Sequence, residues 1–105
     1  MELFLDVISP KPKFVLIDNN KIEESLDILD KDNINVSDSI HNKFLRLQKN
    51  NNFIDYLDTL IVTIGPGSYT SLRVGISFML GISYAKKISI YGLSALNLMS
   101  YINLR

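Results

Sequence analysis

The first half of the chain alternates short apolar runs with turn-forming residues, which is typical of strands joined by tight connections. Apolar residues dominate three segments, at residues 2–8, 13–17 and 21–29. Ser9–Pro12 separates the first two segments and Asp18–Asn20 separates the last two, and both connections carry turn chemistry. The sequence therefore predicts three successive strands at the start of the chain.

Helical spacing replaces this alternation after a polar connector at residues 30–36. Ser37-Asp38-Ser39 can cap a helix, and a run of asparagines at residues 50–52 ends it. Between them, apolar side chains recur near the helical period at Ile40, Phe44, Leu45 and Leu47. A short helical or irregular stretch at residues 53–57 then leads into an apolar strand at residues 59–64.

A glycine turn after that strand starts a second, longer helix. We expect this helix at residues 68–86, a strand at residues 88–91 and a last helix from Ser94 to the end. Strands followed by strand-helix-strand alternation predict an α/β class with a mixed sheet. A length of 105 residues and an apolar content of 47% fit one small domain.

Composition narrows the function classes. The net charge is zero, which argues against unassisted binding of tRNA over a broad basic surface. All eleven acids lie in residues 1–58, and the acid-free remainder indicates burial on more than one side. No cysteine and a single histidine, His41, leave no ligand set for zinc. The longest nearly apolar stretch, residues 74–85, is shorter than the roughly 18 residues of a membrane span, so we expect a soluble, cytoplasmic protein.

The glycine turn at residues 65–73 fits none of three familiar glycine motifs. A dinucleotide turn needs a third glycine where Thr70 stands, a Walker loop needs a lysine, and a nucleophile elbow needs a glycine two residues after its serine. Two interpretations stay open: a backbone turn that starts a helix, which the residues favour, and an anion site at the helix N-terminus, with Ser68 or Thr70 as the cap. The turn motif consists of Gly65, Pro66, Gly67, Ser68, Tyr69, Thr70 and Arg73.

The long second helix carries apolar side chains in nearly every direction. Residues 72–85 contain a single charge, so one apolar stripe cannot account for them. We expect one set to face the sheet, namely Val74, Phe78, Gly81 and Ala85, and a second set to face elsewhere, namely Leu72, Ile76, Met79 and Ser83. The cover for the second set is either another helix of this chain or a partner protein.

The glycine turn, the apolar helix, Ala85-Lys86-Lys87 and the segment Gly92–Leu96 together resemble the TsaB (YeaZ) family of bacterial tRNA threonylcarbamoyladenosine biosynthesis proteins. The resemblance is strong from residue 60 to about residue 99. It implies an RNase H-like lobe of the actin-like ATPase superfamily, a Gcp-like domain with a mixed sheet flanked by helices. Residues 1–105 then form the family's first lobe alone, with the usual second lobe absent.

The resemblance also implies a function in tRNA processing. This chain would be a non-catalytic subunit that binds and activates TsaD, which modifies the adenosine next to the anticodon. TsaE would join through the complex, ATP would bind the partner proteins, and tRNA would be touched only indirectly. No catalytic residue, cofactor or metal is expected on this chain. A homodimer without TsaD, and a nucleotide-binding or peptidase-like module that uses the Gly65–Arg73 turn, are the alternatives.

Two details refine what the family likeness implies. Val7-Ile8-Ser9 after Asp6 replaces the family's Asp-Thr-Ser pattern, and Ser71 replaces a glycine, which argues against independent nucleotide chemistry. TsaB-like proteins pair through the first two helices, which here implies partner-binding residues His41, Phe44, Leu45, Gln48, Ser71, Leu72, Gly75, Ile76, Met79 and Ile82. Glutamate at Met79 or Gly75 is then expected to abolish TsaD binding and leave the lobe folded.

Overall fold

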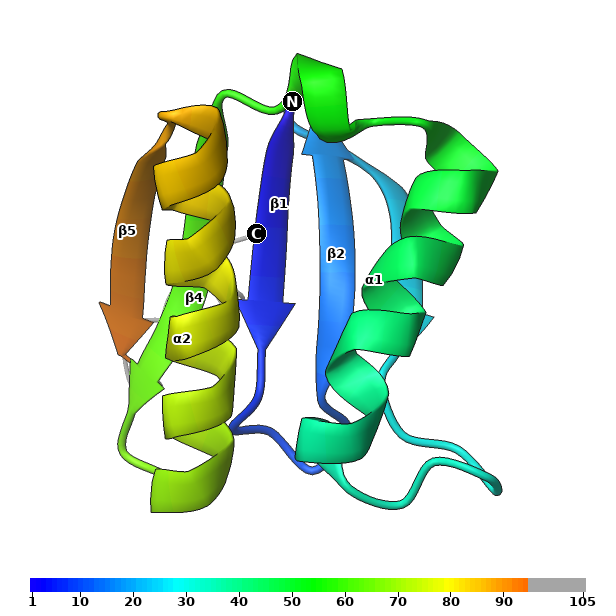
Figure 1. Cartoon of the computed structure of the whole chain (residues 1–105), viewed down its shortest axis with the longest axis vertical. Coiled ribbons are helices and arrows are strands. Elements are labelled where there is room, and N and C mark those ends of the chain that lie inside the picture. Colours follow the sequence, from blue (N-terminus) through cyan, green and yellow to red (C-terminus); the bar gives the residue numbers. More distant parts are fainter. Residues whose placement is uncertain (95–105) are drawn as a thin grey trace.

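The chain folds into one mixed sheet with helices packed on one of its faces. The structure, a computed structural model, describes residues 1–94, and both helices of this part lie on the same side of the sheet (Figure 1). The elements are β1 (Glu2–Asp6), β2 (Lys13–Asp18), β3 (Lys21–Asp27), α1 (Val36–Asn51), the 3₁₀ turn η1 (Ile54–Tyr56), β4 (Thr59–Gly65), α2 (Tyr69–Lys86) and β5 (Ser89–Ser94). The helix expected from Ser94 onward lies outside the described residues, except for Ser94, which ends β5.

The strand order is β3-β2-β1-β4-β5, which places β1 in the centre. β1, β2 and β3 pair antiparallel, whereas β4 and β5 run parallel to β1. Asn19 and Asn20 both adopt positive φ angles, 52° and 64°, which suits a two-residue hairpin turn between β2 and β3. Parallel neighbours need longer crossovers, and α1 and α2 supply them. The predicted α/β class with a mixed sheet is confirmed.

The core lies between the helices and one face of the sheet. Leu3 and Leu5 of β1 and Leu60 of β4 are fully buried on this face. An aromatic cluster, which we define as Phe14, Phe44, Phe53 and Phe78, joins β2 to both helices. Because these rings come from distant parts of the sequence, the cluster fixes α1 and α2 against each other as well as against the sheet.

The start of α1 differs from the prediction. Asn35, not Ser37, Asp38 or Ser39, is the N-cap: its Oδ1 accepts a hydrogen bond of 2.9 Å from the Asp38 N–H. The hydroxyl of Ser39 instead donates to the Asn35 carbonyl from inside the first turn, at 2.7 Å. The helix therefore begins earlier than expected, because asparagine caps as well as serine and stands one turn upstream.

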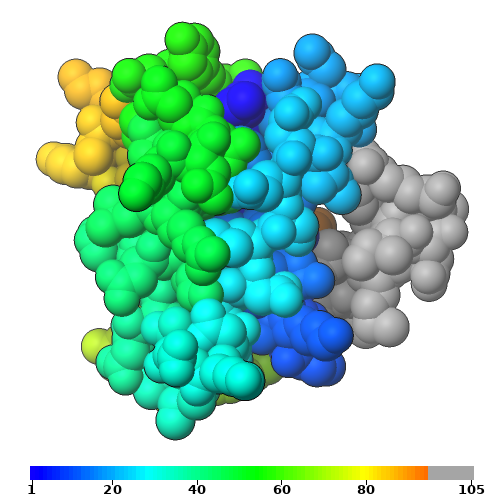
Figure 2. Space-filling model, turned by 90° about the vertical axis from the view of Figure 1, so that its right-hand side faces the viewer, coloured from blue at the N-terminus to red at the C-terminus, as the bar shows by residue number. Residues whose placement is uncertain are grey.

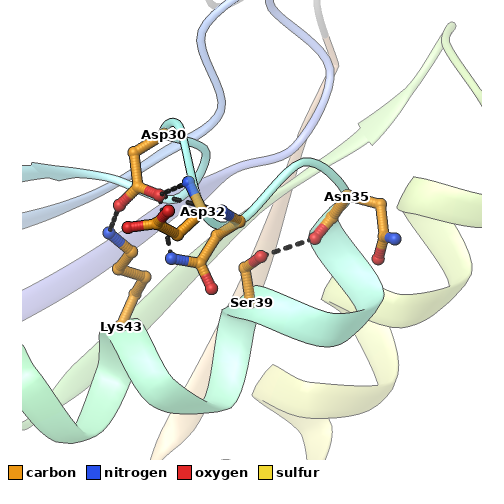
Figure 3. A network of polar contacts seen from close by, with 6 residues as sticks. Asp30, Asp32, Asn35, Ser39 and Lys43 are labelled. Atoms are coloured by element: carbon orange, nitrogen blue, oxygen red, sulfur yellow. Dashed lines mark hydrogen bonds and ion pairs between the residues drawn. The ribbon is translucent and has the colours of Figure 1, made fainter.

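The loop before α1 is organised around Asp30 (Figure 3). Its Oδ1 accepts hydrogen bonds from the N–H groups of Asp32 and Asn33, at 3.0 and 2.9 Å, and its Oδ2 pairs with the Nζ of Lys43. The Lys43 ammonium, with the Asn33 side chain, holds the pKa of Asp30 well below its usual range. Lys43 lies on the buried side of α1, so the carboxylate compensates a charge that has left water.

Replacing Asp30 with Asn is expected to lower the melting temperature by about 4–8 °C, because it leaves the Lys43 ammonium buried without a counterion. Asp32→Asn, in the same loop, is the matched control and leaves the melting temperature near that of the wild type. The contribution of Asp30 to the free energy of unfolding is complete above about pH 4. It decreases as the pH falls below that value, because the pKa of Asp30 is lower in the folded than in the unfolded protein. Thermal melts at pH 7 and pH 3 check this, and an equal gap between wild type and Asp30→Asn at both pH values would contradict it.

The opposite end of α1 is tied down by Gln48. Its Oε1 accepts hydrogen bonds from the N–H groups of Phe53 and Ile54, both at 3.0 Å. Asn51 donates to Glu24 of β3 at 2.8 Å, so the helix end is anchored to the edge of the sheet. Figure 2 shows this side of the molecule, with α1 packed beside the hairpin that contains β3.

Candidate functional site

The glycine turn lies between the end of β4 and the start of α2, next to the end of β1. Gly65 has a φ of +128°, which side-chain-bearing residues rarely adopt. A Cβ on Gly67 would lie 2.9 Å from Cγ2 of Ile8, so the turn passes directly over the segment that follows β1. Backbone geometry and close packing therefore account for both glycines, as the turn interpretation requires.

Ser68 is the N-cap of α2, whereas Thr70 lies inside the first helical turn. The Ser68 carbonyl accepts from the Leu72 N–H at 2.9 Å, and its Oγ accepts weakly from the Ser71 N–H at 3.5 Å. Of the two capping candidates, the structure selects Ser68. The boundaries predicted for this helix are confirmed within one residue.

Asp6 closes the end of β1. Its Oδ1 accepts hydrogen bonds from the N–H groups of Ile8 and Ser9, at 2.9 and 3.2 Å, and the side chain is buried. The adjacent Val7 N–H donates to Oγ1 of Thr63 in β4, at 3.1 Å. These contacts show that Asp6 stabilises the end of β1.

A shallow hollow of about 570 Å³ lies beside the first turns of α2. Arg73 contributes the one charge among its lining residues, and no carboxylate or histidine belongs to the lining, which consists of Ile64, Tyr69, Leu72, Arg73, Ile76 and Ser77. Such a surface suits an apolar side chain better than a chemical step, because it offers no acid, base or paired nucleophile. In residues 1–94, no group of three or more histidine, cysteine, aspartate or glutamate side chains is arranged to hold a metal ion.

The predicted orientation of α2 is wrong. Gly75 and Met79 face the sheet: a Cβ on Gly75 would lie 3.0 Å from Cγ1 of Val7, and Met79 is 0% exposed. Phe78 turns toward α1, with its ring centroid 5.3 Å from that of Phe44. Gly81 and Ala85, which we expected against the sheet, are exposed. A helix with apolar residues all round carries no clear stripe, so its sheet-facing side could not be derived from periodicity.

The ten predicted partner-binding residues fall into three groups. His41 and Leu45 of α1 are exposed, and the His41 ring stands edge-on to Phe78 at 6.3 Å. Gly75 and Met79 are buried in the core of this chain, so they present no surface to a partner. The half-buried members are Phe44, Gln48, Ser71, Leu72, Ile76 and Ile82.

Two exposed residues of α2 are absent from the partner-binding set predicted from the sequence. Leu80 is 49% exposed and Tyr84 is 89% exposed. They follow Arg73 and Ser77 at helical spacing, and these two polar residues could have marked the outward side. We define the outer helix surface as the exposed residues His41 and Leu45 of α1 and Ser77, Leu80 and Tyr84 of α2.

This fold and site define an RNase H-like lobe with an exposed helix surface and a hollow whose lining holds no carboxylate or histidine. Two solved structures share the fold. YeaZ from Pseudomonas aeruginosa has a TM-score of 0.73 at 18% identity, and the match covers 89% of this chain and 44% of that one. A second, titled as an uncharacterized protein with similarity to peptidase YeaZ from Pseudomonas aeruginosa, has a TM-score of 0.74 at 18% identity, covering 89% and 42%.

The family is shown by the sequence itself. Residues 45–104 match the family described as TsaD: tRNA N6-adenosine threonylcarbamoyltransferase, and this chain belongs to that family. The resemblance to TsaB (YeaZ) proteins and the RNase H-like fold are thereby confirmed. The chain spans less than half the length of the two solved structures. No curated protein matches it in sequence. Neither helix of residues 1–94 is both long and apolar enough to cross a bilayer.

Proposed function

We propose that this chain is a TsaB-like, non-catalytic subunit of the cytoplasmic system that makes threonylcarbamoyladenosine in tRNA, and that it binds and activates TsaD. In this proposal the chain supplies the first lobe of such a subunit and carries no cofactor. TsaE joins through the complex, ATP binds the partner proteins, and tRNA is contacted only through the assembly. The single observation that carries the proposal is the outer helix surface on a lobe of this family.

The outer helix surface has the composition of a protein interface. An exposed tyrosine with apolar neighbours supplies contact area at low entropic cost, and such residues dominate binding energies when a partner buries them. Tyr84 is the most exposed large hydrophobic side chain of α2, and Leu45 offers a second apolar group on α1. Since Phe44 and Phe78 hold the two helices together, this surface is preorganised for docking.

The glycine turn supports the non-catalytic part of the proposal. Asp6, the carboxylate nearest to the family's usual acidic pattern, is buried and accepts bonds from two backbone N–H groups. Arg73 is exposed beside an apolar hollow and has no partner acid in the lining. The residues around the turn thus stabilise its conformation, and in this proposal TsaD carries out the reaction.

Replacing Tyr84 with Ala is expected to weaken TsaD binding by about 30-fold or more, because a tyrosine buried at an interface contributes about 2 kcal/mol or more. Tyr91→Ala is the matched control, since Tyr91 is 59% exposed but lies on β5 opposite Ile61, on the sheet face away from the helices. Titration calorimetry of each variant with purified TsaD gives the dissociation constants. Equal losses for both variants, or no binding by the wild type, would refute the proposal. ATP binding that disappears in Arg73→Ala would favour the nucleotide-binding alternative instead.

A further inference from the structure

Exposed residues of α2 form one continuous stripe along the helix. They follow one another at spacings of three or four residues, and we define the α2 stripe as Tyr69, Arg73, Ser77, Leu80 and Tyr84. At 1.5 Å per residue, the stripe extends about 22 Å, from the glycine turn to the last turns of α2. Its second half belongs to the outer helix surface, its first half lines the hollow, and Ser77 belongs to both. A partner on the outer helix surface therefore lies next to the hollow.

Arg73 is the one charged residue of the α2 stripe. It is exposed, and within residues 1–94 its side chain makes no ion pair. No acid follows Asp58 in the sequence. Lys86, near the other end of the helix, differs, since it pairs with Asp55 at 3.1 Å. The described part of the chain thus supplies no counterion to Arg73, and a partner that covers this residue must bring one.

We propose that the TsaD segment covering the α2 stripe is acidic, a claim that rests on the proposed function and adds the chemistry of the contact to it. A carboxylate of this segment pairs with Arg73, and a neighbouring apolar side chain enters the hollow. Removing a guanidinium from water without a counterion is strongly unfavourable. A carboxylate is the matching group, because it accepts two parallel hydrogen bonds from the guanidinium.

The form of the hollow favours a protein segment over a free small molecule. Ile64, Leu72 and Ile76 supply its aliphatic lining, and Tyr69 of the same lining is 75% exposed. A volume of about 570 Å³ is in the range of small-molecule sites, but such sites enclose most of the ligand, whereas this hollow is shallow. A protein segment brings its own surface to cover the rest. Tyrosine and arginine are also enriched where proteins bind one another.

The charge pattern disfavours a nucleic-acid phosphate as the group that pairs with Arg73. Affinity for nucleic acid rises with the number of phosphates that lysine and arginine neutralise, and the α2 stripe contains a single cation. Three of its other four members are apolar or aromatic, namely Tyr69, Leu80 and Tyr84. A carboxylate next to an apolar side chain matches this combination.

Charge reversal at Arg73 tests the pairing. Arg73→Glu is expected to weaken the binding of purified TsaD by about 30-fold or more, because a like charge then faces the partner's carboxylate. Arg73→Lys keeps the charge but not the two parallel bonds, and is expected to lose less than about fivefold. Lys21→Glu is the matched control, since it changes the net charge equally on an exposed residue of β3 and is expected to leave binding unchanged. Titration calorimetry gives the dissociation constants.

Two outcomes separate this pairing from the proposed function itself. Equal affinities of the wild type, Arg73→Glu and Lys21→Glu for TsaD would overturn the pairing and leave TsaD binding intact, whereas a wild type that does not bind TsaD would reject both. Binding of purified tRNA that disappears in Arg73→Glu, with TsaD binding unchanged, would also overturn the pairing and assign Arg73 to a phosphate.

Photocrosslinking locates the partner's carboxylate. p-Benzoylphenylalanine in place of Tyr69 lies at the hollow, and in place of Ile22, which is 65% exposed on β3, it serves as the control. On irradiation with TsaD, the first variant is expected to attach to one TsaD peptide that contains aspartate or glutamate, and the control to none. Replacing that acid with arginine must then restore the binding of Arg73→Glu by at least about tenfold. No crosslink from position 69, or a crosslinked peptide whose acids give no such rescue, would overturn the proposal.

Discussion

Replacing Met79 with Glu is expected to unfold the lobe. Met79 is 0% exposed and belongs to the core between α2 and the sheet. A carboxylate at this position either loses its hydration or forces α2 away from the sheet, and both cost about 4 kcal/mol or more. Small domains are stable by about 5–15 kcal/mol, so this change removes a large share of the total. The expectation that glutamate at Met79 leaves the lobe folded is thus reversed, because the side chain faces inward.

The neighbouring residue provides the control for Met79→Glu. Leu80 is 49% exposed, so Leu80→Glu keeps its charge in water and is expected to shift the melting temperature by only a few degrees. Circular dichroism at 222 nm, recorded on heating, compares the two variants. A Met79→Glu protein that melts with the wild type, or a Leu80→Glu protein that is equally unstable, would show that α2 is oriented differently from the structure described above.

Replacing Phe44 with Ala is expected to destabilise the lobe by about 3 kcal/mol. Its ring is 5.3 Å from Phe78, 5.6 Å from Phe53 and 6.0 Å from Phe14, measured between centroids, so it is the one member of the aromatic cluster in contact with the other three. Truncation removes buried area, leaves a cavity and breaks edge-to-face contacts. The loss corresponds to a decrease in melting temperature of more than about 10 °C.

Leu45→Ala is the control for Phe44→Ala, since Leu45 is the next residue in α1 but lies on the exposed side. Urea unfolding measures both variants, and equal slopes with shifted midpoints would show that stability alone has changed. A midpoint for Phe44→Ala within error of the Leu45→Ala value would contradict a central role for this ring. Phe44→Leu should recover part of the loss, because most of the volume is retained.

The sheet could be predicted from the sequence because its signals are local. The turn residues at Asn19–Asn20 and the apolar runs on either side of them determine a hairpin without reference to the rest of the chain. The strand-to-helix change at Gly65 is equally local, since the backbone there needs a positive φ. Both features are predicted from the sequence, and the mixed α/β class follows from their order.

The orientation of α2 and the ion pair of Asp30 with Lys43 depend on contacts distant in sequence. Periodicity could not orient a helix that is apolar on every side, and the decisive fact was the space that Gly75 leaves for Val7. In the sequence Lys43 resembles any solvent-exposed lysine of a helix, yet its side chain is buried and pairs with Asp30 of the preceding loop. The partner-binding set was derived from family likeness, which indicates the helices but not which side chains point outward.

The strand order has a consequence for how the chain emerges from the ribosome. β1, β2 and β3 are made first and can pair by local turns, whereas the second neighbour of β1 is β4, with Leu3 opposite Leu60. At about 5–20 residues per second, translation takes roughly 3–11 s to cover that separation. During this interval the strand that ends up in the middle of the sheet is an open edge. A nascent chain of this protein is therefore most exposed to mispairing at what later becomes its best-protected strand.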